Sequence, residues 1–92
     1  MKVFVDFFSV LSDWFGQDTI VIELPTRATY GDLQDHLRRG QGSAAPDQIW
    51  GGAKGCFSDR ILATRNGRPI KDRGAMLQDN DRVKLWPMMA GG

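Results

Sequence analysis

Apolar and polar residues alternate at the start of the chain. In residues 2–8 large apolar side chains occupy both the odd and the even positions, but the charged residue Asp6 occupies an even one. Alternation with a period of two is typical of a strand with one buried face. Asp6 marks its face as solvent-facing, which predicts that Phe8 on the same parity is exposed. The residues predicted to enter the core are Val3, Val5 and Phe7.

The alternation stops at Leu11 and returns at residues 18–24. Leu11 to Gly16 contains the breakers Ser12, Asp13 and Gly16 and is predicted to be a turn, with Trp14 and Phe15 covering the edge of the core. The second alternating stretch places Ile20, Ile22 and Leu24 on one face. Two strands joined by a short connection indicate an antiparallel hairpin.

A single helix is predicted over residues 29–39. Thr29 is suited to the N-cap and Asp32 to the N3 position, close to a capping box, and Gly40 is suited to the position after the helix. Tyr30, Leu33 and Leu37 follow helical spacing and form one apolar face. His36 lies beside this face and is interpreted as a boundary residue.

Residues 41–59 read as an irregular, glycine-rich loop, in which residues 47–50 are suited to one helical turn after Pro46. The lone Cys56 is interpreted as a small filler residue. We expect residues 41–58 to exchange their amide hydrogens faster than the first strand.

The last third of the chain again reads as strands. Arg60 to Asn66 is predicted to be the third strand, and Asn66-Gly67 is a strong two-residue hairpin turn before a short strand at residues 68–70. In the polar stretch from Asp72 to Asp81 only Leu77 is expected to be buried, and Asn80-Asp81 is predicted to form a turn. Residues 82–86 form the last predicted strand, with Val83 and Leu85 inward and Lys84 and Trp86 outward.

Composition excludes several classes of function. The 12 Lys and Arg residues balance 11 Asp and Glu residues, so charge gives no case for binding nucleic acid or an anionic membrane. One cysteine and one histidine make neither an intrachain disulfide nor a usual zinc site. No paired carboxylates, Ser/His arrangement or phosphate-binding loop is visible, so we do not expect an enzyme. No apolar run approaches the ~20 residues of a membrane helix, and no signal peptide is visible, which indicates a cytoplasmic protein.

The sequence ends in a thin tail. Pro87 cannot donate a strand hydrogen bond, so regular pairing is expected to stop near it. The chain is therefore divided into a domain over residues 1–86 and a flexible tail over residues 87–92. The tail ends in Gly91 and Gly92, which have no side chain to block a narrow tunnel, and the Gly92 carboxylate can be activated by another protein. Glycine-rich ends also arise by fraying or from cloning, so the ending alone decides nothing.

The predicted order of elements is strand, strand, helix, strand, short strand, strand, which is an α+β arrangement. This order resembles the β-grasp, a ubiquitin-like mixed sheet of four to five strands with one main helix across it. Together with the Asn66-Gly67 hairpin, the acidic turn before Val83 and the ending Trp86-Pro87 through Ala90-Gly91-Gly92, the chain resembles the MoaD/ThiS-like sulfur carriers, and within them most closely the small subunits of molybdopterin synthase.

The resemblance implies a mechanism and partners. An activating enzyme similar to MoeB or ThiF would use ATP to adenylate the carboxylate of Gly92, and sulfur would then replace the adenylate to give a thiocarboxylate. No cofactor would be bound by the carrier itself. A large synthase subunit similar to MoaE, or another acceptor enzyme, would receive the sulfur.

The resemblance also implies a docking surface. Phe8, Leu62 and Trp86 match positions that form an apolar docking patch in the family, and the strand parities place all three on the outer face. The tail residues expected to contact a partner are Pro87, Met88, Met89 and Ala90.

Three alternatives stay open from sequence. The chain could serve thiamine or cysteine biosynthesis as a sulfur carrier, it could be a ubiquitin-like modifier conjugated through Gly92, or it could be a β-grasp interaction module whose Gly-Gly ending is incidental.

Overall fold

The computed structural model describes residues 1–40, 50–51, 56–57 and 60–88. The elements are β1 (Lys2–Phe7), α1 (Val10–Phe15), β2 (Thr19–Glu23), α2 (Tyr30–Arg39), β3 (Trp50–Gly51), β4 (Cys56–Phe57), β5 (Ile61–Arg65), β6 (Arg68–Pro69) and β7 (Asp81–Pro87).

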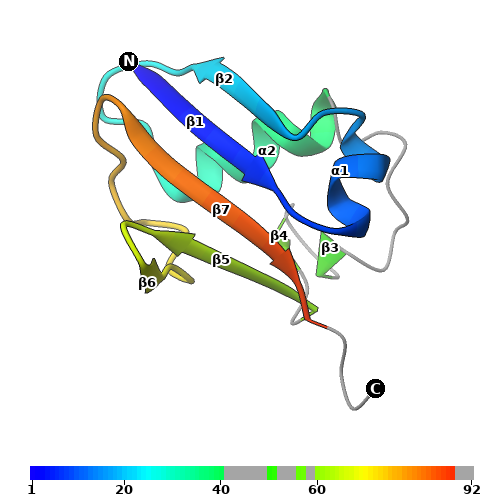
Figure 1. Ribbon diagram of the computed structural model, residues 1–92. Coiled ribbons are helices and arrows are strands. Elements are labelled where there is room, and N and C mark those ends of the chain that lie inside the picture. Colours follow the sequence, from blue (N-terminus) through cyan, green and yellow to red (C-terminus); the bar gives the residue numbers. More distant parts are fainter. Residues whose placement is uncertain (41–49, 52–55, 58–59, 89–92) are drawn as a thin grey trace.

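Five strands form one mixed sheet in the order β2-β1-β7-β5-β6. The first and last strands, β1 and β7, run parallel in its middle, and the remaining pairs are antiparallel. Helix α2 crosses behind the sheet in Figure 1, while α1 follows the carboxyl end of β1. This arrangement is the β-grasp, so the predicted fold class is confirmed.

The core lies between the sheet and α2. The alternation predicted the inward side chains correctly, since Val3, Val5, Val83 and Leu85 are at most 1% exposed and belong to one cluster with Leu33 and Leu37 of the helix. The other buried apolar members are Phe7, Leu11, Phe15, Ile20, Ile22, Leu24, Ala28, Tyr30, Ala63, Ile70 and Leu77. Leu77 is buried as predicted, but it is not alone in its polar segment, because Asp81 is only 7% exposed.

Helix α2 begins as its sequence predicts. The Thr29 side chain accepts from the backbone N–H of Asp32, and the Asp32 carboxylate accepts from the backbone N–H of Thr29 at 2.9 Å, which completes a capping box. The helix ends at Arg39, where the N–H of Gly40 donates to the carbonyl of His36. His36 is half-buried, as expected of a boundary residue.

Three local predictions were wrong. Leu11 to Gly16 is not a simple turn, because residues 10–15 form α1 before Gly16 ends it in a left-handed conformation. The segment read as an irregular loop contains the paired strands β3 and β4, so Trp50 is in a strand and not in a helical turn, while residues 47–49 lie outside the described part. The turn before β7 has Asp79 and Asn80 at its centre rather than Asn80 and Asp81, because the Asp81 N–H closes it on the carbonyl of Gln78 and Asp81 is also the first residue of β7.

The segment from Arg73 to Leu77, which we call the strap, lies across the amino end of α2. The N–H groups of Tyr30 and Gly31 donate to the carbonyls of Ala75 and Arg73, so the strap satisfies helix donors that have no partner inside the helix. The Arg73 guanidinium donates to the amide oxygen of buried Gln34 at 2.8 Å. A Cβ at Gly31 would lie 3.0 Å from the Arg73 Cζ, so the glycine permits this close approach.

Replacing Arg73 by Met is expected to lower the free energy of unfolding by about 1–2 kcal/mol, because the buried amide oxygen of Gln34 loses its donor. Urea denaturation measures the change. The double variant Arg73→Met with Gln34→Leu should recover much of the loss, because the buried amide without a donor is then gone, while the partly exposed ion pair of Arg73 with Asp35 stays lost. The exposed Arg68→Met is the matched control and should change stability by less than about 0.5 kcal/mol. An Arg73→Met protein as stable as this control would contradict the assignment.

Candidate functional site

The three residues expected to form the docking surface lie together on the outer face of the sheet, the face not covered by α2. The rings of Phe8 and Trp86 stack with centroids 3.8 Å apart and an interplanar angle of 4°. Leu62 of β5 is the cross-strand partner of Trp86. We call Phe8, Leu62 and Trp86 the outer patch. Trp86 is 37% exposed, as predicted, whereas Phe8 is half-buried because the indole covers it, which corrects the prediction that it is exposed.

The end of β1 presents one aromatic ring to each face of the sheet. Phe7 points inward and stacks on Phe15 of α1 with centroids 4.3 Å apart, while Phe8 points outward to Trp86. The Phe8 N–H donates to the carbonyl of Leu85, which fixes Phe8 alongside β7. Ser9 follows with φ 57° and ψ −136°, a conformation unfavourable for a residue with a side chain, and this sharp change of direction starts α1.

A charged cluster lies beside the outer patch. Asp6 is on the outer face, as its parity predicts, but it is only 7% exposed, so the prediction that it faces solvent was wrong. Its carboxylate accepts two hydrogen bonds from Arg82, at 2.8 and 2.9 Å, and one from the Thr19 hydroxyl at 2.8 Å. The Arg82 guanidinium also lies 5.1 Å from the centre of the Phe4 ring.

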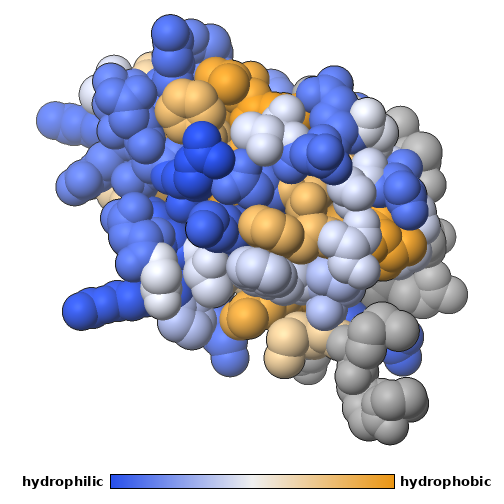
Figure 2. Space-filling model, viewed as in Figure 1, coloured by the Kyte–Doolittle hydropathy of each residue, from blue (hydrophilic) through white to orange (hydrophobic). Residues whose placement is uncertain are grey.

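Figure 2 shows this outer face. Hydrophobic side chains gather near the carboxyl ends of β1 and β7, beside hydrophilic side chains over the middle of the sheet. An apolar patch bordered by polar side chains is typical of an interaction site.

The outer patch lies beside the carboxyl end of β7. Pro87 still pairs with Ile61, and the N–H of Met88 donates to the carbonyl of Arg60, so pairing extends one residue beyond Pro87. The Met88 side chain is 48% exposed. The predicted contact residues Met89 and Ala90 and the predicted reacting residues Gly91 and Gly92 lie outside the described part of the chain.

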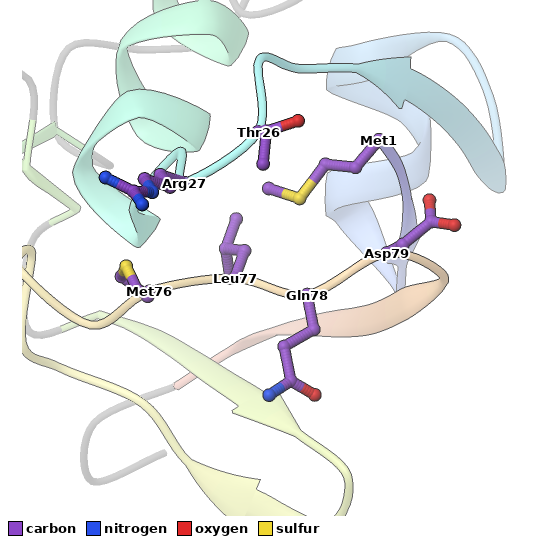
Figure 3. A pocket seen from close by; sticks show the side chains of 7 residues that line it. All are labelled: Met1, Thr26, Arg27, Met76, Leu77, Gln78 and Asp79. Carbon is purple, nitrogen blue, oxygen red and sulfur yellow. The ribbon is translucent and has the colours of Figure 1, made fainter.

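A shallow hollow lies near the amino ends of β1 and β7, away from the outer patch. It lies between the β2–α2 connection and the segment before β7, and Figure 3 shows the side chains that line it: Met1, Thr26, Arg27, Met76, Leu77, Gln78 and Asp79. The Met1 amino group donates to the carbonyl of Leu24, and Asp79 accepts from the N–H of Lys2. These polar groups therefore hold the fold together, and the hollow presents no constellation of reactive groups.

Neither a metal site nor a membrane span is found in the described ranges. No three His, Cys, Asp or Glu side chains among them are placed to hold a metal ion. No helix in the same ranges is long and apolar enough to cross a bilayer.

The five-stranded mixed sheet with one main helix across it defines a small protein of the β-grasp, ubiquitin-like fold, and this one carries an apolar outer patch beside the end of its last strand. The chain belongs to the ThiS family, whose model matches residues 5–92. Members of this family are small carrier proteins that bear a C-terminal thiocarboxylate and are not themselves catalysts. A search of curated proteins finds no match.

Several solved structures are similar to this chain over nearly all of its length. SAMP1 from Haloferax volcanii has 27% identity and a TM-score of 0.84, with 100% of both chains covered. A Pyrococcus furiosus structure assigned to subunit 1 of molybdopterin converting factor has 25% identity and a TM-score of 0.77, over 95% of this chain and 97% of that one. A Helicobacter pylori complex of subunits 1 and 2 of molybdopterin-converting factor matches at 22% identity and a TM-score of 0.63, over 100% of each chain, which supports the shared fold.

The sequence missed the link between Asp6 and Arg82. The signal was present, since Asp6 on the first strand and Arg82 on the last both have outward parity. Their contact depends on the register, in which Phe4 rather than Asp6 is opposite Arg82.

Proposed function

We propose that this protein is a sulfur carrier whose Gly92 carboxylate is adenylated and then converted to a thiocarboxylate, and that it serves as the small subunit of molybdopterin synthase or its tungstopterin equivalent. The observation that carries the proposal is the family match, which runs through Gly91 and Gly92 and covers the body that bears the outer patch. The Pyrococcus furiosus structure supports the molybdopterin assignment.

The chemistry explains why a carrier needs partners. A carboxylate is a poor acyl electrophile, so the Gly92 oxygen attacks the α-phosphate of ATP on a MoeB- or ThiF-like enzyme and pyrophosphate leaves. A sulfur donor then attacks the carbonyl carbon of the adenylated Gly92. A C–S bond forms, the bond from this carbon to the bridging oxygen of the adenylate breaks, and AMP leaves. The thiocarboxylate is a soft nucleophile that a MoaE-like large subunit can use inside its own site. The Helicobacter pylori complex of two subunits supports this second partnership.

Conjugation to proteins is the second candidate. The similarity to SAMP1, described as a small archaeal modifier protein, extends over the whole of both chains. The same adenylated Gly92 would then form an isopeptide bond with a lysine amine.

Mass spectrometry of the intact protein tests the proposal. After incubation with ATP, a sulfur donor and the cognate adenylating enzyme, one terminal oxygen is expected to be replaced by sulfur, and fragmentation should place the change at Gly92. An unmodified carrier with an enzyme shown to be competent would refute the carrier function. A Gly92 isopeptide to a target lysine, without sulfur transfer to a pterin precursor by the large subunit, would favour the modifier.

A further inference from the structure

The outer face of the sheet carries one more positive than negative charge at its strand positions. Among the described strand positions with outward parity, the charged residues are Lys2, Asp6, Glu23, Arg82 and Lys84. Arg82 holds both oxygens of Asp6. Lys2 lies opposite Glu23, whose carboxylate is 4.0 Å from the Met1 amino group, and it stands at the other end of β1 from the outer patch.

Lys84 is the remaining cation. It is exposed, and within the described residues no hydrogen bond or ion pair involves its ammonium group. Its cross-strand neighbours are Asp6 on β1 and Thr64 on β5. Asp6 is already engaged by Arg82 and Thr19, with only 9% of its side chain exposed, so this carboxylate is occupied.

Lys84 also borders the outer patch. It precedes Trp86 by two residues on the same face of β7, a separation of about 7 Å along a strand. A partner surface that covers Trp86 and continues along β7 over this distance also covers Lys84 and removes water from its ammonium group. Desolvating a charge without a counter-charge is costly, and a carboxylate placed opposite it offsets that cost.

We propose that the surface of the adenylating enzyme that covers the outer patch presents a carboxylate to Lys84, and that this pair helps select the carrier. The inference rests on the proposed function. The adenylating enzyme is the partner to which we assign it, because each sulfur-carrier and modifier function considered for this chain, from pterin, thiamine or cysteine synthesis to protein modification, begins with adenylation of Gly92.

Adenylation kinetics test the pair with the full-length carrier and its cognate adenylating enzyme. Lys84→Glu is expected to raise the KM for the carrier about tenfold with little change in kcat, because a like charge now faces the carboxylate during encounter. Lys84→Met should raise KM about threefold, since only the attraction is lost. Lys71→Glu changes the net charge by the same amount at an exposed site outside the outer face, and it should stay within about twofold of the parent.

Two further measurements separate a local pair from a general charge effect. The difference between Lys84→Glu and the parent should shrink at high salt, because exposed charges are screened. A carbodiimide cross-link from Lys84 to an Asp or Glu of the enzyme should be found by peptide mass spectrometry and be lost in Lys84→Met. Thermal unfolding checks that both Lys84 variants fold.

The outcomes are distinguishable. If the parent carrier is loaded with sulfur but Lys84→Glu and Lys71→Glu have the same KM, the charge pair is wrong and the carrier function stands. If the competent enzyme does not adenylate the parent carrier, both the function and the pair are overturned.

Discussion

Deleting Gly92 is expected to abolish sulfur loading while leaving the fold intact. The shortened tail ends about 3.5 Å short of the position that its carboxylate would otherwise reach. Because a misplacement of about 1 Å can reduce a rate about 100-fold, adenylation should fall by at least that factor. Pyrophosphate release with the adenylating enzyme measures the rate.

The control for this deletion is stability. The core cluster extends to Leu85, and the hydrogen bond of Met88 ties the end of β7 to β5, so removing Gly92 should not change the midpoint of thermal unfolding. Gly92→Ala keeps the length of the chain and tests the side chain alone, and it should lose part of the rate if the tail enters a narrow tunnel. A Gly92 deletion that is adenylated as fast as the parent would show that the terminal carboxylate is not the reacting group.

Replacing Trp86 by Ala is expected to weaken binding to the adenylating enzyme by about 2 kcal/mol or more, as truncation of a central aromatic anchor does. At 25 °C this corresponds to roughly a 30-fold rise in Kd. The physical reason is that the indole stacks on Phe8 and faces Leu62, so its removal leaves the outer patch without its largest contact surface. Isothermal titration calorimetry measures the Kd.

Two variants control for the loss of an exposed apolar side chain. Trp86→Phe retains an aromatic ring against Phe8 and should recover most of the affinity. Met76→Ala removes a 58% exposed side chain at the hollow near the amino ends of β1 and β7, and this variant should bind like the parent. If Trp86→Ala binds within twofold of the parent, the outer patch does not dock this partner.

Much of the fold and of the outer patch was predictable because it depends on local patterns. Outward parity alone placed Phe8, Leu62 and Trp86 on one face, since successive side chains of a strand alternate between faces. The capping box at Thr29 and the Asn66-Gly67 turn depend on neighbouring residues, and both Asn66 and Gly67 have the positive φ that a type I′ hairpin turn requires.

The errors lie where contacts distant in sequence decide the outcome. Helix α1 has only six residues and contains Ser12 and Asp13, so its own propensity is weak. Burial of Leu11 and Phe15, with Phe15 stacked on Phe7, stabilises it, and no local pattern contains that contact. The strands β3 and β4 have two residues each, too few for alternation to be recognised.

The sequence by itself determined the α+β order of elements, which resembles the β-grasp, together with the inward and outward positions of its strands and the Gly-Gly ending, because periodicity and covalent order are local properties. Only the tertiary structure decided how the outward residues interact with one another. The stacking of Phe8 on Trp86 joins residues from opposite ends of the chain, and the ion pair of Asp6 with Arg82 spans 76 positions. The parallel register of β1 and β7 creates both contacts, and by occupying Asp6 it leaves Lys84 without a carboxylate in the described part of the chain.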